Sequence, residues 1–444
     1  MSFRVCRLAL PILVGIVVPL LLAGSALAEL KDGEVLSSEN WQQGAPFLPD
    51  EITNHYKNGD YRTPLADLST GKYKSLDWPT DFRDATAANR GKYTIGPEGN
   101  IVNASDGQPA GFIYGAPFPD IDPKDPEAAR KVVWNYFYNR WFDGNGHFYS
   151  QLGWLSRGAG LERNFIVDAY FLYYQGWKEA RQIPNPLNLL IQNLGTVVEP
   201  ADVNGTATLS WRFLDAKKHD ANWAYVPALR RVRQTSPTNR SDGVLGSDLA
   251  ADDGQYFDAK PEDWDFKLIG EQDMYGLIDR GALEGETQIK PVKGGGYRFV
   301  WDDKPWFAYD KPGTPGAPWA PMESRFVKGR YWVIEAIPKD RYYLFGKIIL
   351  RFDEKTMRGS YSSKYSWKNE LLASYQVQNG VYWSPDGGKT GHVAGRSVYQ
   401  VAENVKLDRA TAVRFDRNPA NPADYKVPLD ASMFDSQALV KAGK

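Results

Sequence analysis

The sequence has 444 residues, and its 53 basic and 54 acidic side chains leave a formal net charge of −1. This balance provides no general attraction for nucleic acid, so we expect no nucleic-acid partner. Hydrophobic residues (42%) and charged residues (24%) have proportions typical of a globular protein, but the aromatic share of 14% is high. Aromatic side chains favour strands and can line an apolar cleft, although they can equally fill a large core.

The N-terminal segment is typical of a secretory signal peptide. Two arginines precede the apolar run 8–22, and the small residues Ala-Leu-Ala end at position 28. We therefore expect cleavage after residue 28 and a soluble periplasmic protein, with an uncleaved membrane anchor as the alternative. The single cysteine, Cys6, would be removed, so the mature chain would form neither a disulfide nor a thiolate metal site. Glu29 stands where a lipoprotein needs cysteine, which indicates that the protein is not a lipoprotein.

The next hundred residues, 29–125, are punctuated by turn formers and hold few periodic runs. They predict a loop-rich N-terminal lead-in that packs on a main domain, residues 126–444. The clearest helix begins that main domain, because Asp125 can cap it and Pro126 suits its first position. Its expected apolar stripe consists of Val132, Val133, Tyr136, Phe137 and Trp141.

From residue 162 onward the pattern indicates strands. Residues 206–213 alternate strictly between apolar and polar side chains, which is the pattern of a half-buried strand. Short turns separate many of the runs, as in an antiparallel meander. We therefore predict an α+β fold in which a curled antiparallel sheet forms an incomplete barrel, with helices covering its concave face. Further strands are expected at 164–174, 264–269, 297–301, 331–337, 343–352 and 371–383.

Residues 223–253 combine an aromatic strand, an arginine cluster, a turn-rich segment and an aspartate cluster. Arginines and carboxylates so close in sequence can form paired contacts that fix a loop. We expect Arg231 and Arg233 to join Asp248 and Asp252 in a latch at the rim of a cavity, where an anionic head group could also bind. The alternative is a charged strand end followed by a solvated loop.

Motifs for catalysis or cofactor binding are not apparent. The four histidines are scattered without metal-site spacing, and the sequence has no GxSxG nucleophile turn. We expect no catalytic residues, no metal and no cofactor. Glu335 is the main exception, because an acid flanked by aromatic residues could act as a general acid in a carbohydrate-active protein. The alternative is that Glu335 is a strand acid that pairs with a basic side chain across the sheet.

Several of these segments resemble one bacterial family, the domain-of-unknown-function family 1329, which is described as similar to outer-membrane lipoprotein-sorting proteins of the LolA/LolB-like fold. The resemblance implies a periplasmic protein with an incomplete antiparallel barrel. Members often lie near genes for resistance-nodulation-division type exporters, which implies envelope transport and an exporter or outer-membrane partner. This chain is about twice the size of a simple LolA-like carrier. The similar segments are 225–233, 246–248, Gly115 to Pro119, Trp134-Asn135 and 343–356.

These observations predict a non-enzymatic carrier or accessory protein that shelters a lipid or other hydrophobic ligand in a barrel-like cavity. A carbohydrate-active or polysaccharide-binding protein and a structural partner of an exporter complex are the alternatives. The register of each strand decides which face lines the cavity, since a slip of one residue exchanges the two faces. The expected lining residues are Leu209, Trp211, Phe213, Trp223, Tyr225, Trp264, Phe266, Trp332 and Ile334.

Overall fold

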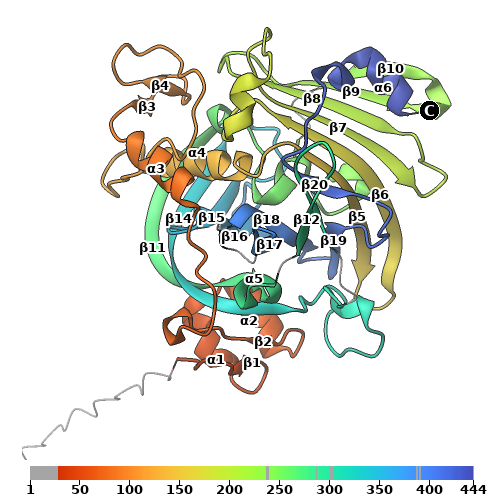
Figure 1. Ribbon diagram of the computed structural model, residues 1–444. Coiled ribbons are helices and arrows are strands. Elements are labelled where there is room, and N and C mark those ends of the chain that lie inside the picture. Colours follow the sequence, from red (N-terminus) through yellow and green to blue (C-terminus); the bar gives the residue numbers. More distant parts are fainter. Residues whose placement is uncertain are drawn as a thin grey trace, which may run out of the picture.

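The computed structural model describes residues 29–443 except 237–239, 287, 301–303, 387, 388, 390 and 391. The predicted signal peptide therefore lies outside the described residues. One large sheet dominates the fold, and two small two-stranded sheets accompany it (Figure 1). The main strands are β5 (Gly146–Ser156), β6 (Gly160–Tyr173), β7 (Leu189–Glu199), β8 (Ala207–Phe213), β9 (Ala221–Val226), β10 (Arg231–Thr235), β11 (Trp264–Asp279), β14 (Ser324–Pro338), β15 (Lys347–Asp353), β16 (Gly359–Tyr365), β17 (Leu371–Trp383), β18 (His392–Asn404) and β19 (Arg409–Phe415).

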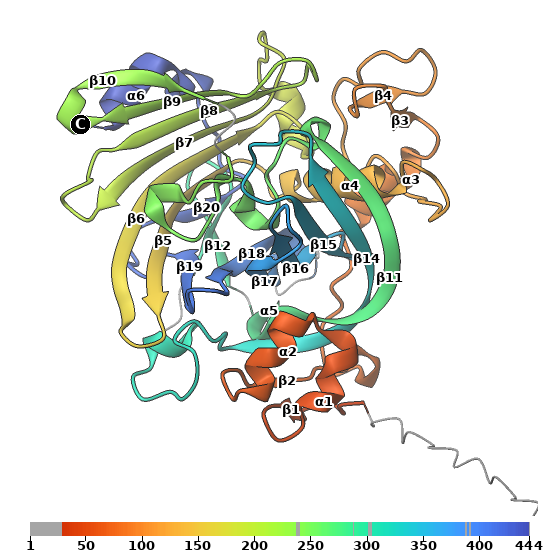
Figure 2. The ribbon, with the colours of Figure 1, turned by 180° about the vertical axis from the view of Figure 1, so that it is seen from behind.

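The strands follow the order β10-β9-β8-β7-β6-β5-β19-β18-β17-β11-β14-β15-β16, and three short strands extend the sheet: β12 (Ile289–Pro291), β13 (Tyr297–Phe299) and β20 (Ala423–Tyr425). The long strand pairs are antiparallel, and β11 meets β17 in parallel at Leu277 and Ile278. The arm containing β5 and β6 lies opposite the arm containing β11 and β14, with β15 to β18 between them (Figures 1 and 2). The sheet curls without closing into a barrel, so the predicted fold class is confirmed.

The predicted helix is α4 (Ala128–Trp141), which starts two residues later than its Pro126 signal suggests. Asp125 still supports this end, because its Oδ1 accepts a hydrogen bond from the amide of Glu127 at 2.8 Å. The expectation of a single apolar stripe is wrong, since twelve of its fourteen residues are buried. The helix lies between the sheet and the lead-in, so nearly its whole surface is covered by protein.

The lead-in contains more regular structure than its turn-rich sequence indicates. It forms α1 (Trp41–Gly44), α2 (Asp50–Lys57), α3 (Thr80–Ala88) and the antiparallel pairs β1 (Val35–Leu36) with β2 (Thr63–Pro64) and β3 (Tyr93–Ile95) with β4 (Ile101–Asn103). Ile52 and Tyr56 of α2 are buried in a cluster with Tyr275 and Phe326 of the main sheet. Helices this short are marginal alone, so tertiary packing stabilises them.

The concave side of the sheet is filled by the chain itself. Helix α4 and the segment 249–264, which includes 3₁₀ helices Ala251–Tyr256 and Pro261–Asp263, share one apolar cluster with β14, β15 and β17. Tyr256 lies so close to β16 that a Cβ atom on Gly359 would be 1.9 Å from its ring, which explains the glycine there. Aromatic residues therefore act here as core residues, the second of the two roles considered for them.

The C-terminal segment covers the opposite face of β8 and β9. A 3₁₀ helix (Ala431–Phe434) and helix α6 (Ser436–Ala442) pack beside β8, β9 and β10 (Figure 1). Phe434 and Leu439 are fully buried in this contact. A short helix α5 (Arg280–Glu284) follows β11 elsewhere in the fold, capped by the side chain of Asp279.

Candidate functional site

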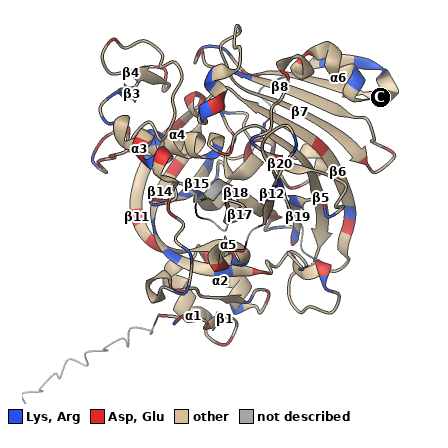
Figure 3. Ribbon diagram, viewed as in Figure 1, with Lys and Arg blue, Asp and Glu red and all other residues tan. Residues whose placement is uncertain are grey.

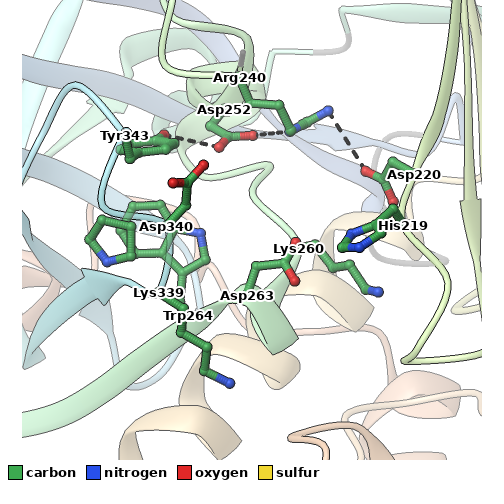
Figure 4. A pocket seen from close by; sticks show the side chains of 11 residues that line it. His219, Asp220, Arg240, Asp252, Lys260, Asp263, Trp264, Lys339, Asp340 and Tyr343 are labelled. Atoms are coloured by element: carbon green, nitrogen blue, oxygen red, sulfur yellow. Dashed lines mark hydrogen bonds and ion pairs between the residues drawn. The ribbon is translucent and has the colours of Figure 1, made fainter. Parts of the chain in front are cut away.

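Two cavities lie on either side of a contact between Asp220 and Arg240. The first, cavity 1, has a volume of about 380 Å³. Trp264, Lys339, Asp340 and Tyr343 approach it from one side, and His219, Asp220 and Lys260 from another (Figure 4). Cavity 1 is lined by His219, Asp220, Arg240, Asp252, Lys260, Asp263, Trp264, Pro338, Lys339, Asp340 and Tyr343.

Cavity 2 has a volume of about 430 Å³ and a more polar lining. Asn193, Ser210, Asn222 and Thr235 come from four adjacent strands and border it with amide and hydroxyl groups. The Oδ1 atom of Asn193 is buried and has no hydrogen-bond partner. The other lining residues are Ile191, Thr208, Leu209, Arg212, Asp220, Trp223, Ser236, Arg240, Val244, Ala251 and Asp258.

A network of buried ions forms the wall between the cavities. The guanidinium of Arg212 contacts both carboxylate oxygens of Asp220, with the shortest distance at 2.8 Å. Arg240 is hydrogen-bonded to Asp252, and its Nη2 also donates to the backbone oxygen of Asp258 at 3.0 Å. By contrast, Nη1 of Arg240 lies 3.7 Å from Oδ2 of Asp220, beyond hydrogen-bond distance.

The charges of this network compensate one another. Arg140 adds a 2.5 Å contact to Asp258, so three arginines face three aspartates. Burial by itself raises the pKa of Asp220, but the charges of Arg212 and Arg240 lower it below its ordinary value. Across the whole protein, basic and acidic residues are intermixed (Figure 3), so such local groupings determine the electrostatics.

One further carboxyl group is buried near this network without a side-chain hydrogen-bond partner. Glu262, between Lys260 and Trp264 of cavity 1, has neither carboxylate oxygen in a hydrogen bond. Burial raises its pKa from 4.5 to about 7, against the opposing charge of Lys260. The ammonium of Lys260 donates instead to the backbone oxygens of Ala216 and Lys218, at 2.6 and 2.7 Å.

The predicted lining residues do not form one surface. Those of β8 and β9 belong to the cluster under the C-terminal helix, on the face opposite the polar side chains of cavity 2. Those of β11 and β14 belong to the core cluster on the concave side. Leu209 and Trp223 border cavity 2 and Trp264 borders cavity 1. The remaining six border neither cavity: Trp211, Phe213, Tyr225, Phe266, Trp332 and Ile334.

The predicted latch is wrong in its pairing. Asp252 binds Arg240 and accepts a hydrogen bond from the Tyr343 hydroxyl at 2.9 Å. Asp248 pairs with Arg409 at 3.0 Å. Arg231 and Arg233 are exposed on β10, and within the described part of the chain neither contacts these two carboxylates. The two arginines lie within β10, whereas Arg240 lies after that strand and its guanidinium binds Asp252.

Sequence reasoning missed most of the charged network. Arg212 offered one usable signal, because it places a large charged group on the polar face of β8, eight residues before Asp220. Arg140 and Asp258 are brought together from positions 118 residues apart, and no local pattern marks that contact. Glu335, the candidate acid, lies in β14 with its Oε2 3.9 Å from Nζ of Lys347, as in the alternative of a strand ion pair.

Within the described ranges, no three His, Cys, Asp or Glu side chains are grouped as metal ligands would be. No helix in the same ranges is long and apolar enough to span a membrane.

The family described as "Protein of unknown function (DUF1329)" matches residues 35–440. This chain belongs to the DUF1329 family. The match extends from β1 in the lead-in to α6 at the C-terminus, so the lead-in is part of the DUF1329 unit. No functionally curated protein is detectably similar in sequence.

Solved structures with a similar chain path include three bacterial proteins. A putative outer membrane lipoprotein-sorting protein domain from Vibrio parahaemolyticus has 16% identity and a TM-score of 0.46, covering 71% of this chain and 100% of its own. A DUF1329 family protein from Desulfovibrio piger has 17% identity and a TM-score of 0.43, with coverage of 69% and 98%. A LolA superfamily protein from Nitrosomonas europaea has 11% identity and a TM-score of 0.40, with coverage of 70% and 98%.

Proposed function

We propose that this DUF1329 protein is a non-enzymatic carrier or accessory protein that binds one amphipathic ligand in cavities 1 and 2. The observation that carries the proposal is the shared wall of two cavities whose volumes fall in the range of about 300–1,000 Å³ found for ligand sites. Trp264, Pro338 and Tyr343 provide an apolar surface in cavity 1. The polar groups of cavity 2 receive the hydrophilic part of the ligand.

The wall between the cavities is suited to admit such a ligand. Asp220 is held by Arg212, and Arg240 is held by Asp252 and Asp258. The 3.7 Å contact between Asp220 and Arg240 contains no hydrogen bond, so its separation joins the two cavities while each ion keeps its hydrogen-bonded partners. Each methylene group that leaves water then contributes roughly 0.8 kcal/mol to binding.

The cellular role that we propose is envelope transport in the periplasm. The secretory character of residues 1–28 and the family resemblance support this location. The ligand is a lipid or another hydrophobic molecule, and an exporter or outer-membrane protein receives it.

The lining of cavity 2 also supports a second candidate, a carbohydrate-binding protein. Hydroxyl and amide side chains are the usual partners of sugar hydroxyls. Oδ1 of Asn193 is a hydrogen-bond acceptor there without a partner. A glycan array distinguishes the two, because the carrier proposal expects no glycan to bind unless it carries an apolar chain.

Two measurements test the carrier proposal. Mass spectrometry of a solvent extract of the native protein should detect a copurified amphiphile. Delipidated protein should take up the apolar fluorescent probe N-phenylnaphthylamine saturably, and His219→Trp, which places a large ring in cavity 1, should weaken that uptake by about tenfold. Lys217→Trp is the matched control, because Lys217 is exposed two residues earlier and borders neither cavity. Equal uptake by the two variants, or no saturable uptake, refutes the proposal.

A further inference from the structure

Three large side chains are exposed together at one end of the sheet. Tyr342 and Leu344 lie in the connection between β14 and β15, with 97% and 53% of their surfaces exposed. Trp367 lies in the turn between β16 and β17 and is 41% exposed. We call residues 339–346 and 366–370 the tip. Exposed aromatic and aliphatic groups gathered in this way mark interaction surfaces in globular proteins.

The tip is a fixed structure that holds these side chains outward. The indole Nε1 of Trp367 donates to the backbone oxygen of Tyr343 at 2.9 Å, which joins the two segments. Tyr343 and Phe345 alternate with the exposed pair and are buried, so they anchor the connection in the core. The amide of Leu344 donates to Oγ of Ser241 at 3.1 Å. The outward direction of Tyr342 and Leu344 is therefore set by their buried neighbours.

Cationic groups surround the apolar side chains. The guanidinium of Arg341 lies 5.0 Å from the ring of Trp367, and Lys339 and Lys368 are exposed nearby. The tip also has two acids. Asp340 accepts a hydrogen bond from the amide of Tyr342 at 2.8 Å, and Glu370 is neutralised by Lys406 at 2.8 Å.

The adjoining turn between β18 and β19 extends the same surface. The pair between Lys406 and Glu370 connects this turn to the tip, and the amide of Val405 donates to the backbone oxygen of Leu372 at 3.2 Å. Leu407 and Val405 are 60% and 38% exposed there.

We propose that the tip docks on a lipid bilayer surface that contains anionic lipids. Tryptophan and tyrosine are favoured at the membrane–water interface, aliphatic side chains bury in it, and arginine and lysine are attracted to anionic head groups. The same connection contributes Lys339, Asp340 and Tyr343 to cavity 1, beside Pro338 at the end of β14. Docking therefore brings the opening of cavity 1 to the membrane, although the tip binds a bilayer whether or not cavity 1 holds a ligand.

Cosedimentation of the full mature chain with vesicles tests this proposal. Vesicles of phosphatidylethanolamine with phosphatidylglycerol should bind the protein, and added sodium chloride should weaken the binding. The double variant Tyr342→Ser with Leu344→Ser should reduce the bound fraction by about tenfold, whereas Tyr342→Phe with Leu344→Ile should retain it. Both positions are exposed, so neither variant disturbs the core.

Leu229→Ser is the matched control, because Leu229 is 52% exposed in the turn between β9 and β10 and its neighbours Arg230 and Arg231 are also basic. It should bind vesicles as the unaltered protein does. Loss of binding in this control together with retention in the tip variant overturns the proposal. Failure of the unaltered protein to bind anionic vesicles also overturns it and indicates a protein partner for the tip. Probe uptake by cavity 1 is measured without vesicles, so the two proposals fail independently.

Discussion

Replacing His55 tests how the lead-in is attached to the sheet. His55 is buried in α2, where its Nδ1 lies 3.0 Å from Asp60 and its Nε2 lies 2.8 Å from Glu403 of β18. The ring of Tyr61 stacks on the imidazole with 4.3 Å between centroids. Asp60 also contacts Arg157 at 2.7 Å. One imidazolium therefore joins two carboxylates that come from the two parts of the chain.

The size of this bridge's contribution to folding stability follows from the pKa of His55. Burial alone lowers this pKa, but the hydrogen bonds and charges of Asp60 and Glu403 raise it from 6.5 to about 9. At roughly 1.4 kcal/mol per pKa unit, the protonated group contributes about 3 kcal/mol to folding. Because the folded-state pKa lies above the unfolded value, this contribution is complete below about pH 6.5 and is lost as the pH rises through about 9.

Urea unfolding of the mature protein and of His55→Gln at several pH values provides the assay. The difference in free energy of unfolding between the two should shrink by about 3 kcal/mol from about pH 6 to about pH 9.5. His219→Gln is the control, since His219 is exposed and has no carboxylate partner in the described structure. A difference for His55→Gln that stays constant over this pH range would falsify the ionic bridge.

Two further substitutions examine other parts of the structure. The raised pKa of Glu262, about 7 against 4.5, means that its contribution to stability is present below about pH 4.5 and is lost as the pH rises through about 7. The free energy of unfolding of the unaltered protein should fall by about 3 kcal/mol between pH 4.5 and 8 because of this group, and Glu262→Gln should lack that fall. Urea unfolding that gives the same pH profile for both proteins contradicts this. Trp211 donates from Nε1 to the backbone oxygen of Phe434 at 2.8 Å and contacts the ring of Trp223. Trp211→Ala should cost about 2 kcal/mol and expose the amides of residues 431–442 to hydrogen exchange, while probe uptake stays unchanged. Reduced uptake with full protection of the C-terminal helix would instead place Trp211 in the ligand site.

Local sequence patterns determined the elements and the fold class. The alternation in residues 206–213 predicts β8, and burial follows the same period in its first half, with Ala207 and Leu209 buried and Thr208 exposed. In its second half Arg212 is buried instead, because it pairs with Asp220. The capping signal of Asp125 and the apolar content after it predict α4 to within two residues. Repeated short turns between such strands predict an antiparallel sheet, because only antiparallel neighbours can be joined so briefly.

Long-range packing decided the positions of the predicted site residues. The alternation in β8 defines two faces, but it does not specify which face is concave, and the apolar face is covered by Phe434, which is 223 residues from Trp211. The charged site depends on the same effect, since Asp258 brings Arg140, Arg212 and Arg240 together from distant parts of the chain. A local sequence pattern indicates which side chains must be buried away from water and which charges must be neutralised. The segment that covers or neutralises them is selected by the folded chain as a whole, because burial and charge pairing are satisfied by any suitable partner that the topology brings near.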